Sequence, residues 1–342
     1  MDLPVRIVGG PLLDERGAPR PLLLVDGAFD TPGLNLSHWP GHATPPALRH
    51  DLSTGSALAF ARLDADERAR LAAGCVAIAN NHYDTDGACS LFAVRHPERA
   101  LPRAEKLLAA ARAGDFFQVP TVEAFRVDAI VGRLGDAGSP LADDVRGLDN
   151  LARWQVLTDH LMERLDAILD GDVAPYRALF AEPEERLRAD QAALSRARRT
   201  EDAALDLCVL QGDASFAPGR HAFHGATTRD RVLVLGASDG GTTARLVFST
   251  LSWFDLVTER RLARPNLDAL CARLNELSGT DPTANLAWRT QKITGAAPEL
   301  WFGAPGVASY AEHNEGLAPS ALAPAAIEAE VRAALAPTAR TP

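Results

Sequence analysis

The residues in this chain best suited to chemistry are His82, Asp84 and Asp86, which alternate directly after the apolar run Cys75–Ala79. Such a run predicts a buried strand, and α/β proteins bind ligands where buried strands end. In an extended chain, residues two apart point the same way, so one imidazole and two carboxylates can converge on one ion. Gly87 then lets the backbone turn. The pattern predicts a divalent-metal site.

Imidazole nitrogen combined with carboxylate oxygen suits Mn²⁺, Fe²⁺, Zn²⁺ or Mg²⁺, and we expect Mn²⁺ first. The segment contains no thiolate, which argues against a structural zinc site. A second interpretation stays open, in which Asp84 and Asp86 only cap the following helix through backbone N–H groups.

The segment Asn81–Ala88, with the apolar strand before it, resembles the first motif of the DHH phosphoesterase superfamily, a His-x-Asp-x-Asp-Gly core. The resemblance covers about residues 75–95. It implies a two-domain phosphoesterase in which His82, Asp84 and Asp86 help to hold a two-metal centre. The Asp-His-His triplet that names the superfamily does not occur in the chain, so the resemblance is to a remote, uncharacterised bacterial branch whose other ligands come from elsewhere.

Candidates for those other ligands lie on both sides of the motif. His38 and His42 belong to a long polar loop that runs to about residue 54 and also contains His50 and Asp51; a loop of this length is usually functional or disordered. Asp115 follows a helical pattern and could end a second segment at the same sheet edge, as the second motif of the resembled family does. We expect Asp115, His38 and His42 to be metal ligands.

Substrate contacts are expected from Asn81, beside the motif, and from Arg289 and Lys292, whose cations suit an anionic substrate. His221 and His224 have ligand spacing only in a helix. Their neighbours favour strand or turn, so we expect a structural role for both.

The elements that position these residues alternate between strand and helix in the first half of the chain, which predicts a parallel sheet. We expect strands at 22–25 and 75–79 and helices at 56–73, 88–95 and 104–113. The second half has runs at 205–210, 231–236 and 243–251, typical of an antiparallel sheet, and helices at 265–277 and 324–336. The fold class is therefore α/β: a parallel-sheet N-terminal domain with helices on both faces, and a smaller α+β C-terminal domain with an antiparallel sheet.

The expected division is a metal-binding domain at 1–180, a charged helical linker at 181–203 and a substrate or cap domain at 204–342. Hydrophobic residues make up 46% of the 342 residues, enough for folding by burial and too many for wholesale disorder. The formal net charge of −10 does not favour a nucleic-acid partner. No apolar run is long enough to span a membrane.

The four cysteines lack Cys-x-x-Cys spacing and fit a reducing compartment, so we expect a cytoplasmic protein. The leading hypothesis is a metal-dependent hydrolase that acts on a small phosphorylated or anionic substrate in the cleft between its domains. Two alternatives stay open: a metalloenzyme of non-phosphoryl chemistry on an amino-acid-like metabolite, and a non-catalytic protein that binds a small anion or a partner. Homodimerisation is also left open.

Overall fold

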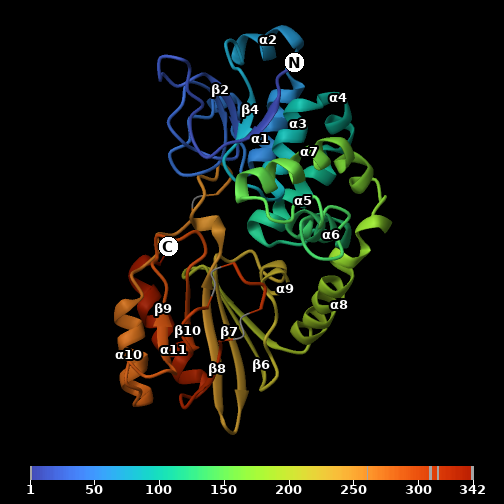
Figure 1. Ribbon diagram of the computed structural model, residues 1–342. Coiled ribbons are helices and arrows are strands. Elements are labelled where there is room, and N and C mark those ends of the chain that lie inside the picture. Colours follow the sequence, from blue (N-terminus) through green and yellow to red (C-terminus); the bar gives the residue numbers. More distant parts are fainter. Residues whose placement is uncertain (1, 260, 308–309, 314–315, 340–342) are drawn as a thin grey trace. The chain divides into compact units, whose positions relative to one another are not determined.

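The computed structural model, drawn in Figure 1, describes residues 2–259, 261–307, 310–313 and 316–339. Within these ranges the chain forms two compact units. The N-terminal unit contains the residues up to Glu185 together with Phe254–Glu259, and the C-terminal unit contains the rest from Arg186 onward.

Short apolar strands form the centre of the N-terminal unit. In the described part of the chain, a four-stranded parallel sheet has the order β1-β4-β2-β3. Its strands are β1 (Val5–Ile7), β2 (Leu22–Val25), β3 (Gly33–Leu36) and β4 (Ile78–Asn80). Every residue of β2 is buried, as expected for a parallel strand covered on both faces.

Helices follow the strands along the chain. They are α1 (Ser53–Arg62), α2 (Ala65–Leu71), α3 (Thr85–Arg95), α4 (Pro97–Ala100), α5 (Ala104–Phe116), α6 (Val122–Arg133), α7 (Asn150–Leu169) and α8 (Arg177–Leu194), with short 3-10 turns at Pro46–Leu48, Leu101–Arg103 and Ala174–Tyr176. The helix expected over 56–73 is two helices, because Asp64 starts α2 by accepting a hydrogen bond from the backbone N–H of Glu67. The long polar loop contains strand β3, whose four residues lack a recognisable apolar run.

The α/β class of the N-terminal unit is confirmed, but its two faces are covered differently. Helices α1, α3 and α7 pack on one face of the sheet, where Leu58, Phe92 and Leu161 join Leu23 and Val25 in the main core (Figure 1). On the opposite face, Leu22 and Leu24 pack with the loop residues Leu12 and Phe29. The second layer is therefore built from loops in place of the expected helices, since so small a sheet needs little apolar cover.

A mostly antiparallel sheet forms the C-terminal unit and confirms the second half of the fold prediction. Within the described residues it has seven strands in the order β5-β6-β7-β8-β10-β9, with β11 beside β8. They are β5 (Arg198–Asp202), β6 (Leu207–Asp213), β7 (Arg231–Ser238), β8 (Gly241–Phe248), β9 (Ala287–Thr290), β10 (Glu299–Gly303) and β11 (Pro319–Ser320). Residues 198–202, expected in a helical linker, are strand β5.

The C-terminal sheet is packed on both sides. Helices α10 (Asp268–Ser278) and α11 (Pro324–Leu335) cover one face, and α9 (Arg220–Gly225) contributes Phe223 to the core of the other. Helix α9 connects β6 to β7, which is why those two strands alone among the described pairs of this sheet run parallel. Short 3-10 turns lie at Thr250–Ser252 and Ala336–Thr338.

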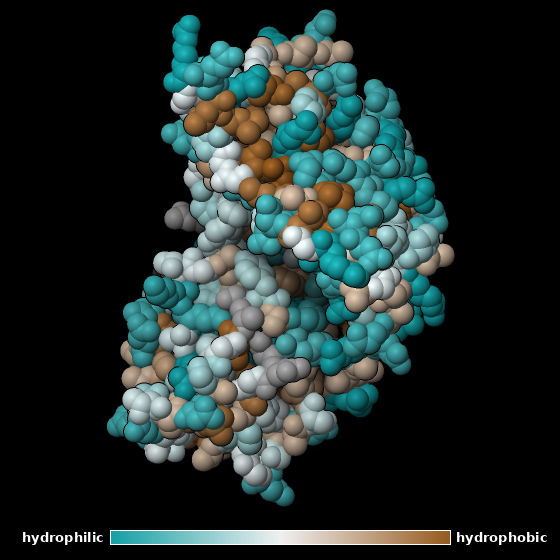
Figure 2. All heavy atoms as spheres, in the orientation of Figure 1, coloured by the Kyte–Doolittle hydropathy of each residue, from teal (hydrophilic) through white to brown (hydrophobic). Residues whose placement is uncertain are grey.

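His221 and His224 lie in α9, so the expectation of strand or turn there was wrong. Both side chains are buried. The charge-rich α8 presents hydrophilic side chains over its visible face in Figure 2, as expected of a solvated helix. None of the helices in the described ranges combines the length and the apolar character that a membrane crossing requires.

Candidate metal centre

Three neighbouring parallel strands end at one edge of the N-terminal sheet, and a polar residue follows each. Asp26 comes directly after β2, His38 two residues after β3, and His82 two residues after β4. Because β4, β2 and β3 are adjacent in the sheet, their carboxyl ends bring these side chains together, at the place where open α/β sheets bind ligands. Asp86, in the first turn of α3, and Asp115, in the last turn of α5, complete the cluster.

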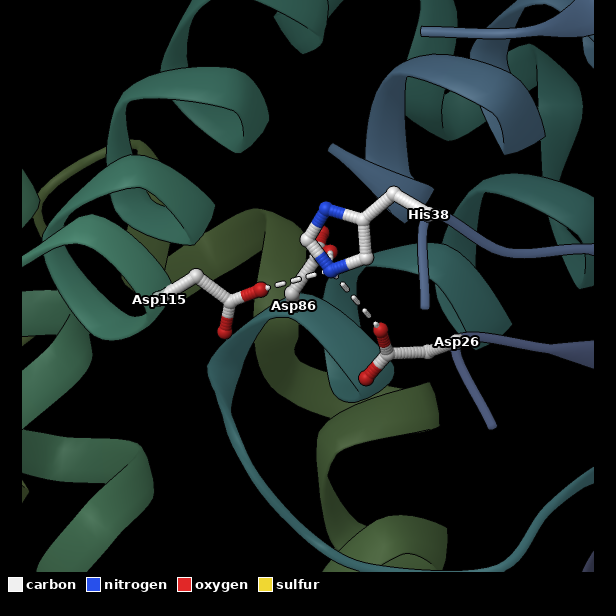
Figure 3. Close-up of side chains that lie close together, drawn as sticks. All are labelled: Asp26, His38, Asp86 and Asp115. Atoms are coloured by element: carbon white, nitrogen blue, oxygen red, sulfur yellow. Dashed lines mark ion pairs between the residues drawn. The ribbon is translucent and has the colours of Figure 1, made fainter. Parts of the chain in front are cut away.

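The first grouping, called the His38 set, consists of Asp26, His38, Asp86 and Asp115. His38 Nε2 lies 3.0 Å from an oxygen of Asp115, 3.6 Å from one of Asp86 and 3.7 Å from Oδ1 of Asp26. Figure 3 shows the three carboxylates around this nitrogen. All four residues offer one ligand atom, these atoms lie within 4.8 Å of one another, and such a group could hold a metal ion.

The second grouping, called the His82 set, consists of Asp26, His82 and Asp84. His82 Nε2 lies 2.9 Å from Asp84 Oδ2 and 3.1 Å from Asp26 Oδ2. Asp26 therefore belongs to both sets, with Oδ1 toward His38 and Oδ2 toward His82. One carboxylate shared in this way is the arrangement that holds two ions side by side.

Both imidazoles are oriented by a hydrogen bond at the other ring nitrogen. His38 Nδ1 lies 2.6 Å from the carbonyl oxygen of Asp51, and His82 Nδ1 lies 2.9 Å from the side-chain oxygen of Asn81. A carbonyl oxygen only accepts, so each Nδ1 carries a proton, and each Nε2 faces the carboxylates. Metal-binding histidines are held in the same way.

Asp84 and Asp86 also accept backbone hydrogen bonds, so the helix-cap interpretation is right in part. Asp84 caps α3 by accepting from Gly87 N at 2.8 Å. Asp86 caps a different helix, accepting from Ser53 N and Thr54 N of α1, each at 2.8 Å. Each carboxylate oxygen has two lone pairs, so these bonds fix the carboxylates and leave lone pairs for a cation.

Asp26 is the most unusual residue of the site. Its side chain is fully buried, and His82 Nε2, 3.1 Å from Oδ2, is an ion-pair partner, although neither carboxylate oxygen accepts a hydrogen bond within the described residues. His38 Nε2 is likewise buried without a hydrogen-bond partner in the described chain. Asp26 also has a φ of 58°, which non-glycine residues rarely adopt. Buried polar atoms without hydrogen bonds are costly. A cation in the His38 set would satisfy His38 Nε2 and Asp26 Oδ1, and one in the His82 set would satisfy Asp26 Oδ2.

The metal-free site has strongly shifted pKa values. Burial, together with Asp84 and Asp86, raises the pKa of Asp26 to about 6, and burial and the neighbouring carboxylates raise that of Asp115 well above its ordinary value. Burial lowers the pKa of His82, but Asp84 and Asp26 outweigh it and raise that pKa to about 11. For Asp84, His82 and the Gly87 N–H outweigh burial and lower the pKa to about 2. A bound cation would take the place of the protons that this cluster attracts.

The structure brings together five of the six ligands expected from the sequence: His38, His82, Asp84, Asp86 and Asp115. The sixth, His42, is in neither set; its Nδ1 accepts a hydrogen bond from Thr44 N at 3.2 Å. Asp115 lies within helix α5 and not beyond its end, because the helix, expected to stop at residue 113, continues through Gly114 to Phe116.

The expected substrate residues have other partners. Asn81 orients His82. Arg289 donates to the carbonyl oxygens of Ala284 and Gly303 within the C-terminal unit, so its guanidinium stabilises a turn and a strand. Lys292 is an exposed side chain of the same unit.

Asp26 is the ligand that sequence reasoning missed. The signal was present, since Asp26 directly follows the apolar run Leu22–Val25, just as the motif follows Cys75–Ala79. Unlike His82, Asp84 and Asp86, which alternate along the chain, Asp26 is not followed by a second polar residue two positions later.

Comparison with known proteins gives one match. The model of a protein family described as "Family of unknown function (DUF6687)" matches residues 12–341, a range that includes every residue of both sets. No curated protein and no solved structure matches the chain.

Proposed function

Since the chain belongs to the DUF6687 family, whose function is unknown, we propose from the site alone that this protein is a metal-dependent hydrolase with two divalent ions. Its substrate is a small phosphorylated or otherwise anionic molecule. The observation that carries the proposal is the shared, fully buried Asp26, whose two orphaned oxygens face two separate histidine-carboxylate sets.

The chain's own residues would hold each ion in a prepared position. His38, Asp86 and Asp115 would hold one ion, His82 and Asp84 the other, and Asp26 both. Nitrogen and carboxylate ligands of this kind favour Mn²⁺, with Fe²⁺, Zn²⁺ and Mg²⁺ as alternatives. When bound, such ions lower the pKa of a water molecule and neutralise charge on a phosphoryl group.

Charge supports an anionic substrate. Once bound ions displace their protons, the four carboxylates of the two sets would carry four negative charges, which two divalent ions balance. With a single ion the cluster would stay negative and repel an anion, so the second ion matters for binding as well as for hydrolysis. The resemblance of Asn81–Ala88 to the DHH first motif supports a phosphoester substrate, and the proposal replaces the missing triplet with Asp26, His38 and Asp115.

The proposal includes a cytoplasmic location. Cys75, Cys89, Cys208 and Cys271 are free thiols, as expected in a reducing compartment.

The metal part of the proposal is tested by titrating Mn²⁺ into the full chain after chelator treatment. We expect two ions for the wild type and one for each of His38→Ala and His82→Ala. Asp30→Asn, which removes an exposed charge close to the site in sequence, is the control and should bind two. Absence of Mn²⁺ binding, or unchanged stoichiometry in both histidine variants, would overturn the assignment.

The reaction class is tested with a panel of phosphomonoesters and phosphodiesters in Mn²⁺. We expect hydrolysis by the wild type and by Asp30→Asn, and its loss in His82→Ala. Two bound ions without turnover of any member would overturn the phosphoesterase proposal and favour non-phosphoryl chemistry or a binding protein.

A further inference from the structure

A short segment of the chain leaves the C-terminal unit and returns to it. Residues Arg186–Trp253 belong to the C-terminal unit, Phe254–Glu259 belong to the N-terminal unit, and the chain from Arg261 onward belongs to the C-terminal unit again. The segment has no helix or strand of its own, so its contacts alone determine its conformation.

The first of these contacts is with a residue of the candidate metal centre. The ring of Phe254 is stacked on the imidazole of His38, with centroids 3.8 Å apart and planes 20° from parallel. The backbone N–H of Asp255 donates to the carbonyl oxygen of His38 at 2.9 Å. The Asp255 carboxylate accepts from Gly41 N at 3.2 Å. The segment thus holds both the ring and the backbone of His38.

A second set of contacts reaches the same imidazole through Asp51. The Asp51 carboxylate accepts hydrogen bonds from Val257 N at 2.6 Å, from Thr258 N at 3.0 Å and from the Thr258 hydroxyl. The carbonyl oxygen of Asp51 is the acceptor for His38 Nδ1. One residue therefore joins the returning segment to the edge of the ring opposite the carboxylates.

We propose that Phe254 and Asp51 are positioning residues for His38, and that the segment Phe254–Thr258 is a working part of the metal centre. Stacking limits rotation of the imidazole about its bond to Cβ, and the Asp51 carbonyl selects the tautomer with its proton on Nδ1. Together they direct the Nε2 lone pair toward Asp26 and Asp115. The role in metal binding rests on the proposed function, whereas the control of the ring stands on these contacts alone.

A positioning role accounts for the contacts of the segment Phe254–Thr258 with His38 and Asp51. Neighbours of a metal-binding histidine commonly change metal affinity by 10- to 100-fold when they are removed. The support here comes from residues more than 200 positions away in the sequence. Only the His38 set receives it, because His82 is oriented locally by Asn81, so the two ions should respond differently.

The experiment compares Phe254→Ala and Asp51→Ala with the wild type, in the full chain. Phe254→Tyr keeps the stacked ring and is the rescue variant. Val257→Ala changes a side chain that is 51% exposed in the same segment and is the matched control. Two quantities are measured on folded protein: the tautomer of His38 without metal, from ¹⁵N shifts of the imidazole assigned with His38→Ala, and the affinity for Mn²⁺.

We expect a single Nδ1–H tautomer in the wild type, Phe254→Tyr and Val257→Ala. Asp51→Ala keeps the backbone carbonyl that accepts from Nδ1 and removes only the carboxylate that holds this backbone to Val257 and Thr258. We therefore expect a mixture of tautomers in Phe254→Ala, where the ring can rotate, and in Asp51→Ala, where the carbonyl is no longer held in place. One of the two Mn²⁺ sites should weaken by about 10-fold or more in the latter two variants, and the other should change little. An unchanged tautomer and unchanged affinities in a folded Phe254→Ala protein would overturn the inference. If the wild type bound no Mn²⁺, the proposed function would fail, and the tautomer measurement would still decide whether the segment controls His38.

Discussion

Replacing Asp26 by asparagine should change stability and metal binding in opposite directions. The substitution keeps the shape of the side chain and removes its charge. The wild-type carboxylate is fully buried and receives no hydrogen bond from the described residues, so its ionised form is unfavourable in the metal-free protein. The same carboxylate is the residue common to the His38 set and the His82 set and is therefore the proposed shared ligand.

The size of the stability effect follows from the pKa. Burial raises the pKa of Asp26 from 3.8 to about 6, and one pKa unit is worth about 1.4 kcal/mol. The raised pKa means that the folded state holds its proton more tightly than the unfolded state, so stability falls as pH rises from about 4 to 6 and stays low above that. Metal-free Asp26→Asn should therefore be more stable than the wild type by about 3 kcal/mol at pH 7, and by almost nothing near pH 4.

Urea denaturation followed by circular dichroism measures both effects. At pH 7 with chelator, Asp26→Asn should unfold at a higher urea concentration than the wild type. Mn²⁺ at about 100 times its Kd should stabilise the wild type by about 2.7 kcal/mol for each site and leave Asp26→Asn almost unchanged. Asp30→Asn removes the same charge from an exposed position and should follow the wild type throughout.

Two results would refute this reasoning. If metal-free Asp26→Asn were less stable than the wild type at pH 7, the interaction of the carboxylate with His82 would outweigh the cost of its burial. If Mn²⁺ stabilised both proteins equally, Asp26 would not be a ligand.

Three further predictions concern the site and the second unit. A methyl group at Gly87 would collide with the side-chain nitrogen of Asn80 and lie close to carboxylate oxygens of Asp84 and Asp26. Gly87→Ala should therefore weaken Mn²⁺ binding at least about 10-fold, as measured by titration calorimetry, and an affinity equal to that of the wild type would contradict this. Binding of Mn²⁺ at pH 7 should release at least one proton, because the pKa of metal-free His82 is raised to about 11, and the affinity for Mn²⁺ should rise with pH. Calorimetry in buffers of different ionisation enthalpy measures the number of protons released, and identical binding heats in all buffers would exclude proton release. Arg220→Met removes the nearer of two ion-pair partners of the fully buried Glu299, the other being Arg245 at 3.8 Å. It should destabilise the C-terminal unit by about 3 kcal/mol in urea. A double change that also makes Glu299→Leu should recover part of the loss, and failure to do so would argue against the pair.

The sequence by itself determined the strands and helices with strong local patterns and the motif between them. The motif could be recognised from the sequence alone, because the apolar run Cys75–Ala79 and the alternating His82, Asp84 and Asp86 are neighbours in the chain. The same is true of most helices, whose apolar residues recur at helical spacing. Strand β3, with four residues and no apolar run, and the split between α1 and α2 at Asp64 depend on weaker signals and were not predicted.

Only the tertiary structure decided which of the other polar residues join the motif. Asp26, His38 and Asp115 reach it because β4 lies between β1 and β2, an order that differs from the order of the chain, and because α5 packs beside α3. Phe254, more than 200 positions after His38 in the sequence, stacks on its imidazole. Local patterns specify elements, whereas the pairing of strands and the packing of helices depend on contacts between distant residues. The candidate metal centre is assembled from such contacts.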